Sequence, residues 1–315
     1  MQEIKRTGLG KRSSHIAGIT TNLVKFRWQY AMLLPGVVCL FLFSYMPMVG
    51  VQIAFRNYRI GNTIWNARWV GLTNFRFFLD PEFWRVLKNT LVISVSRFVF
   101  GFPAPIILAL LINEIRSLTF KRLVQSVTYL PHFISWVVVA YLIDAFLAPN
   151  TGLLNQFFMR FGGESIFFMG RVDLFVPIIV ISNVWKTIGW GTIVYLAAIT
   201  GIDPEMYEAA TIDGANRFAQ VWHITIPCII PTVVLMLILA MPSLLNAGMD
   251  QIYPLQNNVN LPVSNVLDIY ILNNGLRQGR YSMSTAVGLV NSLVALFLIV
   301  VSNKAANKLS GDGLW

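Results

Sequence analysis

Residues 201–227 read GIDPEMYEAATIDGANRFAQVWHITIP and lie between two long apolar runs of the chain. Asp203 is a good helix N-cap, and Pro204 suits the first position of a helix, so we expect a helix to begin there. Gly214 is placed to end that helix in a left-handed turn. This part of the stretch therefore predicts one short helix that is closed by a tight turn.

The second part of the same stretch predicts another short helix, at about residues 215–223. At helical spacing it would carry Phe218 and Trp222 on one face before Pro227 begins the next apolar run. Two short helices with a turn between them, held between two apolar runs, form a rigid lever. A push on this loop is expected to move both of the runs that it joins.

Outward from this loop, the whole chain has the composition of a membrane protein. Of its 315 residues, 56% are hydrophobic and only 12% are charged, whereas soluble domains carry roughly 25% charged residues. Helices of about 20 apolar residues cross a bilayer. The sequence predicts an all-α protein with a six-helix transmembrane bundle over residues 30–303, an N-terminal basic tail (1–29) and a C-terminal tail (304–315). The predicted spans are residues 30–54, 86–112, 124–147, 174–200, 224–245 and 284–303.

The net charge of +10 does not indicate nucleic-acid binding, because the basic residues flank apolar spans, where they meet lipid head groups. Counts of Lys and Arg differ little between the two sides, with twelve on the side of the termini and ten on the other. Six of them precede the first span, whose flank usually dominates orientation. Both termini are therefore expected in the cytoplasm. These six residues are Lys5, Arg6, Lys11, Arg12, Lys25 and Arg27.

The loop also carries a family motif. The spacing E-A-A, three residues, G, nine residues, I-x-L-P resembles the EAA motif of ABC importer permeases of the MetI-like type, with Ile226 where Leu is usual. The resemblance implies that the loop docks on a separate ABC ATPase subunit, with Glu208 as the polar contact and Gly214 as the turn. The residues that carry it are Glu208, Ala209, Ala210, Asp213, Gly214, Ala215, Ile224 and Pro227.

Further segments resemble carbohydrate permeases, and residues 129–137 (YLPHFISWV) resemble the LplB-type polysaccharide branch. The family implies a bacterial cytoplasmic membrane protein with several partners: two ATPase subunits, a second homologous permease and an extracytoplasmic solute-binding protein. ATP and Mg²⁺ would bind the ATPase subunits, and no cofactor is expected on this chain. The resemblance implies an oligosaccharide as the substrate, with uronic acid units as the more specific expectation.

A substrate path needs polar side chains inside the spans. Asn183, Lys186 and Trp190 lie on one predicted helix face, with Trp185 and Tyr195 nearby; aromatic rings with amides and charges suit sugars. For Lys186, snorkelling to the membrane interface is an equal alternative. Weaker candidates are Asn246, Asp250 and Asn291.

Other charged and titratable residues are expected to be structural. Arg97 and Asp144 fall in the second and third spans, where an interhelical ion pair would offset the cost of each charge. His132 and His223 lack partners at metal-ligand spacing, so no metal site is expected.

The chain has no G-x-x-x-x-G-K-[ST] loop, which is needed to hold ATP, and no catalytic constellation. The chain is therefore expected to be a non-catalytic membrane subunit, with ATP hydrolysis on separate partner subunits, and the missing constellation disfavours a membrane enzyme. The alternative is an ion-coupled secondary transporter, which should show inverted repeats and buried carboxylates.

Overall fold

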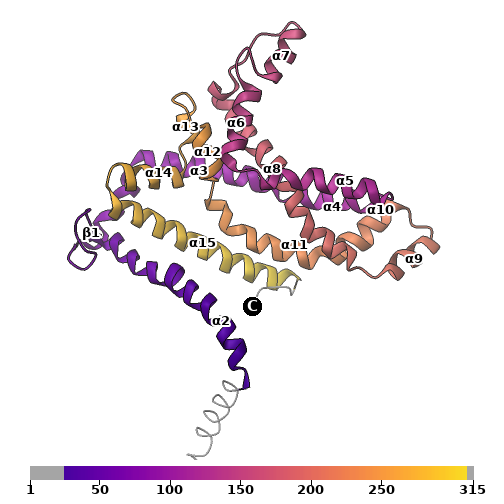
Figure 1. Ribbon diagram of the computed structural model, residues 1–315, viewed down its shortest axis with the longest axis horizontal. Coiled ribbons are helices and arrows are strands. Elements are labelled where there is room, and N and C mark those ends of the chain that lie inside the picture. Colours follow the sequence, from indigo (N-terminus) through magenta and orange to yellow (C-terminus); the bar gives the residue numbers. More distant parts are fainter. Residues whose placement is uncertain (1–24, 311–315) are drawn as a thin grey trace, which may run out of the picture.

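The computed structural model describes residues 25–310. Most of the predicted basic tail, with Lys5, Arg6, Lys11 and Arg12, and the end of the C-terminal tail lie outside these residues. The described chain is helical except for loops and a two-residue antiparallel hairpin of β1 (Arg56–Asn57) and β2 (Arg68–Trp69) (Figure 1). The helices are α2 (Arg27–Leu40), α3 (Pro81–Gly101), α4 (Pro103–Asn113), α5 (Leu118–Tyr129), α6 (Trp136–Leu147), α7 (Leu153–Arg160), α8 (Val172–Thr200), α9 (Pro204–Ile212), α10 (Arg217–Gln220), α11 (Ile226–Ala240), α12 (Met249–Leu255), α13 (Leu261–Ser264), α14 (Leu267–Leu272) and α15 (Tyr281–Ser310).

Within the described residues, five helical segments are long and apolar enough to cross a membrane. They are Arg27–Phe55, Pro81–Asn113, Val172–Thr200, Arg217–Leu255 and Tyr281–Lys308. Each contains or largely overlaps one of the predicted spans, which confirms the all-α membrane class. Helix α15 extends to Ser310, past the predicted end of the span at residue 303, so the first residues of the predicted C-terminal tail are helical.

The third predicted span, 124–147, is broken. Leu118–Phe133 and Trp136–Leu147 meet at a bend of 102°, and in Figure 1 α6 and α7 project away from the layer of long helices. Ile134 is extended at the break, and the Ser135 side chain accepts a hydrogen bond from the Val138 N–H, which caps the start of α6. The predicted span 124–147 is therefore a bent pair of helices, because a new helix capped by Ser135 begins there.

Helix α8 is the centre of the bundle and packs against α3, α4 and α5. A Cβ atom on Gly189 would lie 2.1 Å from the Thr128 carbonyl oxygen, so only glycine lets α5 approach this closely. On the α4 side, the Thr192 hydroxyl donates to the Pro105 carbonyl at 3.2 Å. Backbone-to-backbone approach with a hydrogen bond across the interface is the way membrane helices associate without a hydrophobic driving force.

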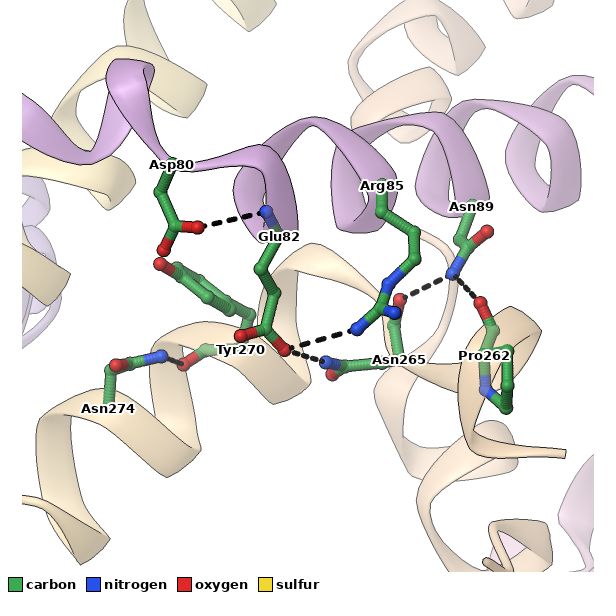
Figure 2. A network of polar contacts seen from close by, with 8 residues as sticks. All are labelled: Asp80, Glu82, Arg85, Asn89, Pro262, Asn265, Tyr270 and Asn274. Atoms are coloured by element: carbon green, nitrogen blue, oxygen red, sulfur yellow. Dashed lines mark hydrogen bonds and ion pairs between the residues drawn. The ribbon is translucent and has the colours of Figure 1, made fainter. Parts of the chain in front are cut away.

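At the end of the bundle away from α9, a polar network joins the start of α3 to the α13–α14 segment (Figure 2). Asp80 caps α3 by accepting from the Glu82 N–H, and the Asn89 amide donates to the carbonyls of Pro262 and Asn265. Burial, with Asp80 and Glu82 nearby, raises the pKa of Tyr270 to about 12. These contacts hold the α13–α14 segment against the start of α3.

Candidate functional site

The loop between α8 and α11 begins as the sequence predicted. The Asp203 carboxylate accepts from the Glu205 N–H at 3.0 Å, and Pro204 is the first residue of α9. Gly214 ends the helix with φ +81°, and the Ala215 N–H donates back to the Ala210 carbonyl at 2.8 Å. This is the left-handed closure that the glycine predicted.

The second half of the loop differs from the prediction. Helix α10 does not stop before Pro227; it continues through a π-helical turn, Val221–Thr225, directly into α11. The rings of Phe218 and Trp222 do stack on one face, with centroids 6.4 Å apart, as expected. Because α10 and α11 form one continuous rod, any displacement of the loop passes straight into that span.

Contacts at the base of the loop hold α9 against its neighbours. The Tyr207 and Thr225 hydroxyls are 2.9 Å apart, and Arg217 forms an ion pair with Glu114 at 3.1 Å. A surface hollow of about 740 Å³ lies beside these contacts, and Glu208 and Ala215 are among its lining residues. Glu208 is exposed at this hollow, where a partner can reach it.

A second concave site, open on one side, lies among the membrane-spanning helices. It is a cavity of about 410 Å³ where α3, α8 and the Met241–Gly248 region between α11 and α12 meet. Asn183 and Asn246, two of the predicted path residues, come together there, as shown by their place in its lining. Its polar side chains are those of Ser94, Arg97, Asn183, Thr187, Ser243 and Asn246.

The predicted Arg97–Asp144 ion pair is not formed. Arg97 Nη1 donates instead to the Ala247 carbonyl at 2.5 Å, and none of the ion pairs among residues 25–310 includes Arg97. Asp144 is exposed and lines a different cavity beside Tyr141. The bend after α5 explains the difference, because it carries α6 away from the direction of a straight third span.

Lys186 and Trp190 do not line the cavity either. The Lys186 ammonium is buried, donates to the carbonyls of His132 (2.7 Å) and Pro131 (3.4 Å), and lies 5.1 Å from the Trp136 ring centroid. The Trp190 ring stacks on the His132 ring at 4.5 Å with only 4° between their planes. Both residues therefore hold the bend between α5 and α6, and the Lys186 ammonium points at backbone carbonyls of that bend.

The remaining predicted path residues are scattered. Tyr195 is buried in the apolar core between α4, α8 and α11, whereas Trp185 is half exposed. Asp250 is exposed beside Trp136 in another cavity. Asn291 on α15 is half-buried, and its Oδ1 has no hydrogen-bond partner within the described residues.

Several residues of the cavity were missed by the sequence reasoning. They are Ser94, Phe98, Thr187, Ser243 and Gly248. Helical spacing could have found some of them: Ser94 lies three residues before Arg97 on α3, Phe98 lies four residues after Ser94, and Thr187 lies four residues after Asn183 on α8. Ser243 and Gly248 lie in the irregular segment after α11, where periodicity carries no signal.

Residues 101–308 match the family of the binding-protein-dependent transport system inner membrane component. The chain belongs to this family. Over 294 residues it is 44% identical to Protein LplB of Bacillus subtilis (strain 168), covering 93% of this chain and 92% of that protein. It is 43% identical, over the same shares, to the polygalacturonan/rhamnogalacturonan transport system permease protein YteP of the same organism.

The structure of this inner membrane component is also similar to one that has been solved. A chain of a bacterial ABC transporter involved in the import of the acidic polysaccharide alginate superposes with a TM-score of 0.86 at 38% identity, covering 93% of this chain and 99% of that one. The same transporter has been solved in complex with an alginate pentasaccharide-bound periplasmic protein. The expected MetI-like permease fold and the multi-pass membrane location are thereby confirmed.

Proposed function

We propose that this inner membrane component translocates a uronate-containing oligosaccharide as one half of the pore of an ABC importer. The observation that carries this proposal is the cavity of about 410 Å³ inside the membrane-spanning helices, lined by amides, hydroxyls and one guanidinium. Such groups replace the hydration of sugar hydroxyls along a path through an apolar medium. Relatives named for polygalacturonan, rhamnogalacturonan and alginate support an acidic sugar.

In this proposal the α9–α10 loop lies in the cytoplasm with both termini and docks on one of two ABC ATPase subunits, and ATP and Mg²⁺ bind on those subunits. Glu208 on α9 provides the polar contact, and the rod formed by α10 and α11 passes the movement to the cavity, whose lining includes Ala240 and Ser243 beyond the end of α11. A second homologous permease completes the pore, and an extracytoplasmic solute-binding protein delivers the sugar. The cavity has no acidic side chain in its lining, which disfavours an ion-coupled transporter.

The test is to purify the tagged chain with the products of its neighbouring genes and reconstitute the complex in liposomes. An ATPase should accompany the chain. Uptake of a galacturonate trisaccharide should require ATP on the side of the liposome membrane where the ATPase subunits lie. Glu208→Gln should lower uptake at least about tenfold if it removes a hydrogen bond to a charged group at the ATPase interface.

Glu205→Gln is the matched control, since Glu205 is an exposed carboxylate one turn earlier on the same helix. It should leave uptake within about twofold, because it loses only an interaction with the helix dipole. Absence of an ATPase from the purified complex, together with normal uptake by Glu208→Gln, contradicts the proposal.

A further inference from the structure

Arg97 is a cation in the middle of a membrane-spanning segment, Pro81–Asn113, and it has no counter-ion among residues 25–310. Its guanidinium forms one hydrogen bond within those residues, from Nη1 to the Ala247 carbonyl. A guanidinium has five N–H donors. A charge inside a bilayer is costly unless it is paired or faces water, so an unpaired arginine here indicates an anionic ligand that pairs with it during function.

The turn that holds Arg97 is shaped around the guanidinium. Gly248 has φ +80°, and a Cβ atom at this position would lie 2.1 Å from Arg97 Nη1. The Asn246 side chain fixes the turn by accepting from the Gly248 N–H at 2.8 Å. Arg97 is thus held from one side by the backbone of a glycine turn, and its other donors remain available to the cavity that both residues line.

A neutral side chain of the same cavity is also buried without a partner. The Ser94 hydroxyl, on a residue that is 3% exposed, has no hydrogen-bond partner in the described chain. The largely buried Asn183 lines the same cavity and adds an amide to it. Buried polar groups are normally satisfied, so an unpartnered hydroxyl in a cavity that also holds an unpaired guanidinium marks a place built for a polar ligand.

The chemistry of the lining selects the ligand. A guanidinium binds a carboxylate through two parallel hydrogen bonds, which an uncharged sugar cannot offer. Phe98 and Phe102, stacked with ring centroids 5.3 Å apart, add an apolar wall of the kind that covers the C–H face of a pyranose. Amides and hydroxyls are left for the sugar hydroxyls.

We infer that Arg97 binds the carboxylate of one uronate unit in the translocation path and so determines specificity for acidic over neutral oligosaccharides. This inference rests on the proposed function, because it names the residue through which that same cavity recognises its substrate. Ser94 and Asn183 bind hydroxyls of the unit whose carboxylate Arg97 holds. Asp144, which the sequence predicted to pair with Arg97, lines a separate cavity and does not compete for the guanidinium.

The experiment measures binding to the complete complex of permeases and ATPases without the solute-binding protein, so that the specificity of that protein does not enter. The ligands are a galacturonate trisaccharide and the same trisaccharide with its carboxyl groups reduced to alcohols. Arg97→Gln should raise the Kd for the acidic ligand about 10- to 100-fold, and change the Kd for the neutral one by less than about twofold. Glutamine keeps an N–H donor for the Ala247 carbonyl.

Arg97→Lys keeps the positive charge but not the two parallel N–H donors of the guanidinium, so it should weaken binding of the acidic ligand by an intermediate factor. This variant also serves as the test if Arg97→Gln does not fold. Lys88→Gln, an exposed cation on the same helix, is the matched control and should change neither affinity. Equal losses for both ligands, or no loss for either, overturn the inference. Failure of the unaltered complex to take up any uronate oligosaccharide overturns the proposed function instead, and is read in the separate uptake assay.

Discussion

Arg97 on α3 and Lys186 on α8 are both cations within membrane-spanning helices, yet their surroundings are opposite. Lys186 is buried, with its ammonium on two carbonyls and against the Trp136 ring. Arg97 has one carbonyl partner and lines a cavity in which the Ser94 hydroxyl has no partner within the described residues. The difference teaches that the intramembrane cation with fewer local hydrogen bonds is the stronger functional candidate. Lys186 donates two of its three N–H groups to carbonyls and packs on a ring, which favours a structural role.

The bend between α5 and α6 creates this difference. Where α5 ends, carbonyls such as that of His132 lose their helical partners, as at any helix C-terminus. Inside a bilayer water does not satisfy them, and Lys186 donates to them instead. The same bend takes Asp144 away from Arg97, leaving the guanidinium without a carboxylate. One break in one helix therefore gives both cations their environments.

The largest expected effect comes from removing the structural cation. Lys186→Met leaves the His132 carbonyl unsatisfied and removes the contact with the Trp136 ring, which should lower the free energy of unfolding by roughly 2–4 kcal/mol. Thermal unfolding in detergent measures this, and uptake of acidic and neutral sugars should fall in the same proportion. Lys88→Met, on an exposed site, is the control. A stable Lys186→Met protein with altered substrate preference would reverse the comparison between the two cations.

A smaller effect is expected from disturbing Arg97 through its neighbour. Gly248→Ala forces a methyl group into the guanidinium and should raise the Kd for a uronate oligosaccharide by about tenfold, or roughly 1.4 kcal/mol. Gly279→Ala is a matched control, because Gly279 has a similar φ of +70° and open space around its Cβ position. Both variants should lose about 1–2 kcal/mol of stability from the left-handed backbone. Equal uronate binding by the two would show that Gly248 does not position Arg97.

The smallest effect is expected at the ring stack beside Lys186. Trp190→Leu removes the stacking on His132 and should cost about 0.5–1.5 kcal/mol of stability without changing the Kd for either sugar. Trp185→Leu, a change on the same helix at a similarly exposed tryptophan, should cost less. Unfolding temperatures of the two variants in the same detergent make the comparison. A selective loss of sugar binding in Trp190→Leu would return this ring to the substrate path.

Local sequence signals predicted much of this molecule correctly. Asp203, Pro204 and Gly214 begin and end α9 as expected, because caps and a left-handed turn depend on neighbours only a few residues away. Periodicity failed at residues 130–136, where an apolar run hides a helix break. Pro131 followed by Ser135 was the available signal, and it was outweighed by continuous hydrophobicity.

The sequence by itself determined the membrane class, the positions of five apolar spans and the helix–turn structure of the loop at residues 203–214, because apolar length and short-range capping are properties of contiguous residues. Only the tertiary structure decided which polar side chains share a cavity. Asn183 and Asn246 meet Arg97 there, whereas Lys186 and Asp144 do not. The physical reason is that these partners lie on different helices, and a single bend of 102° sets which of them can approach.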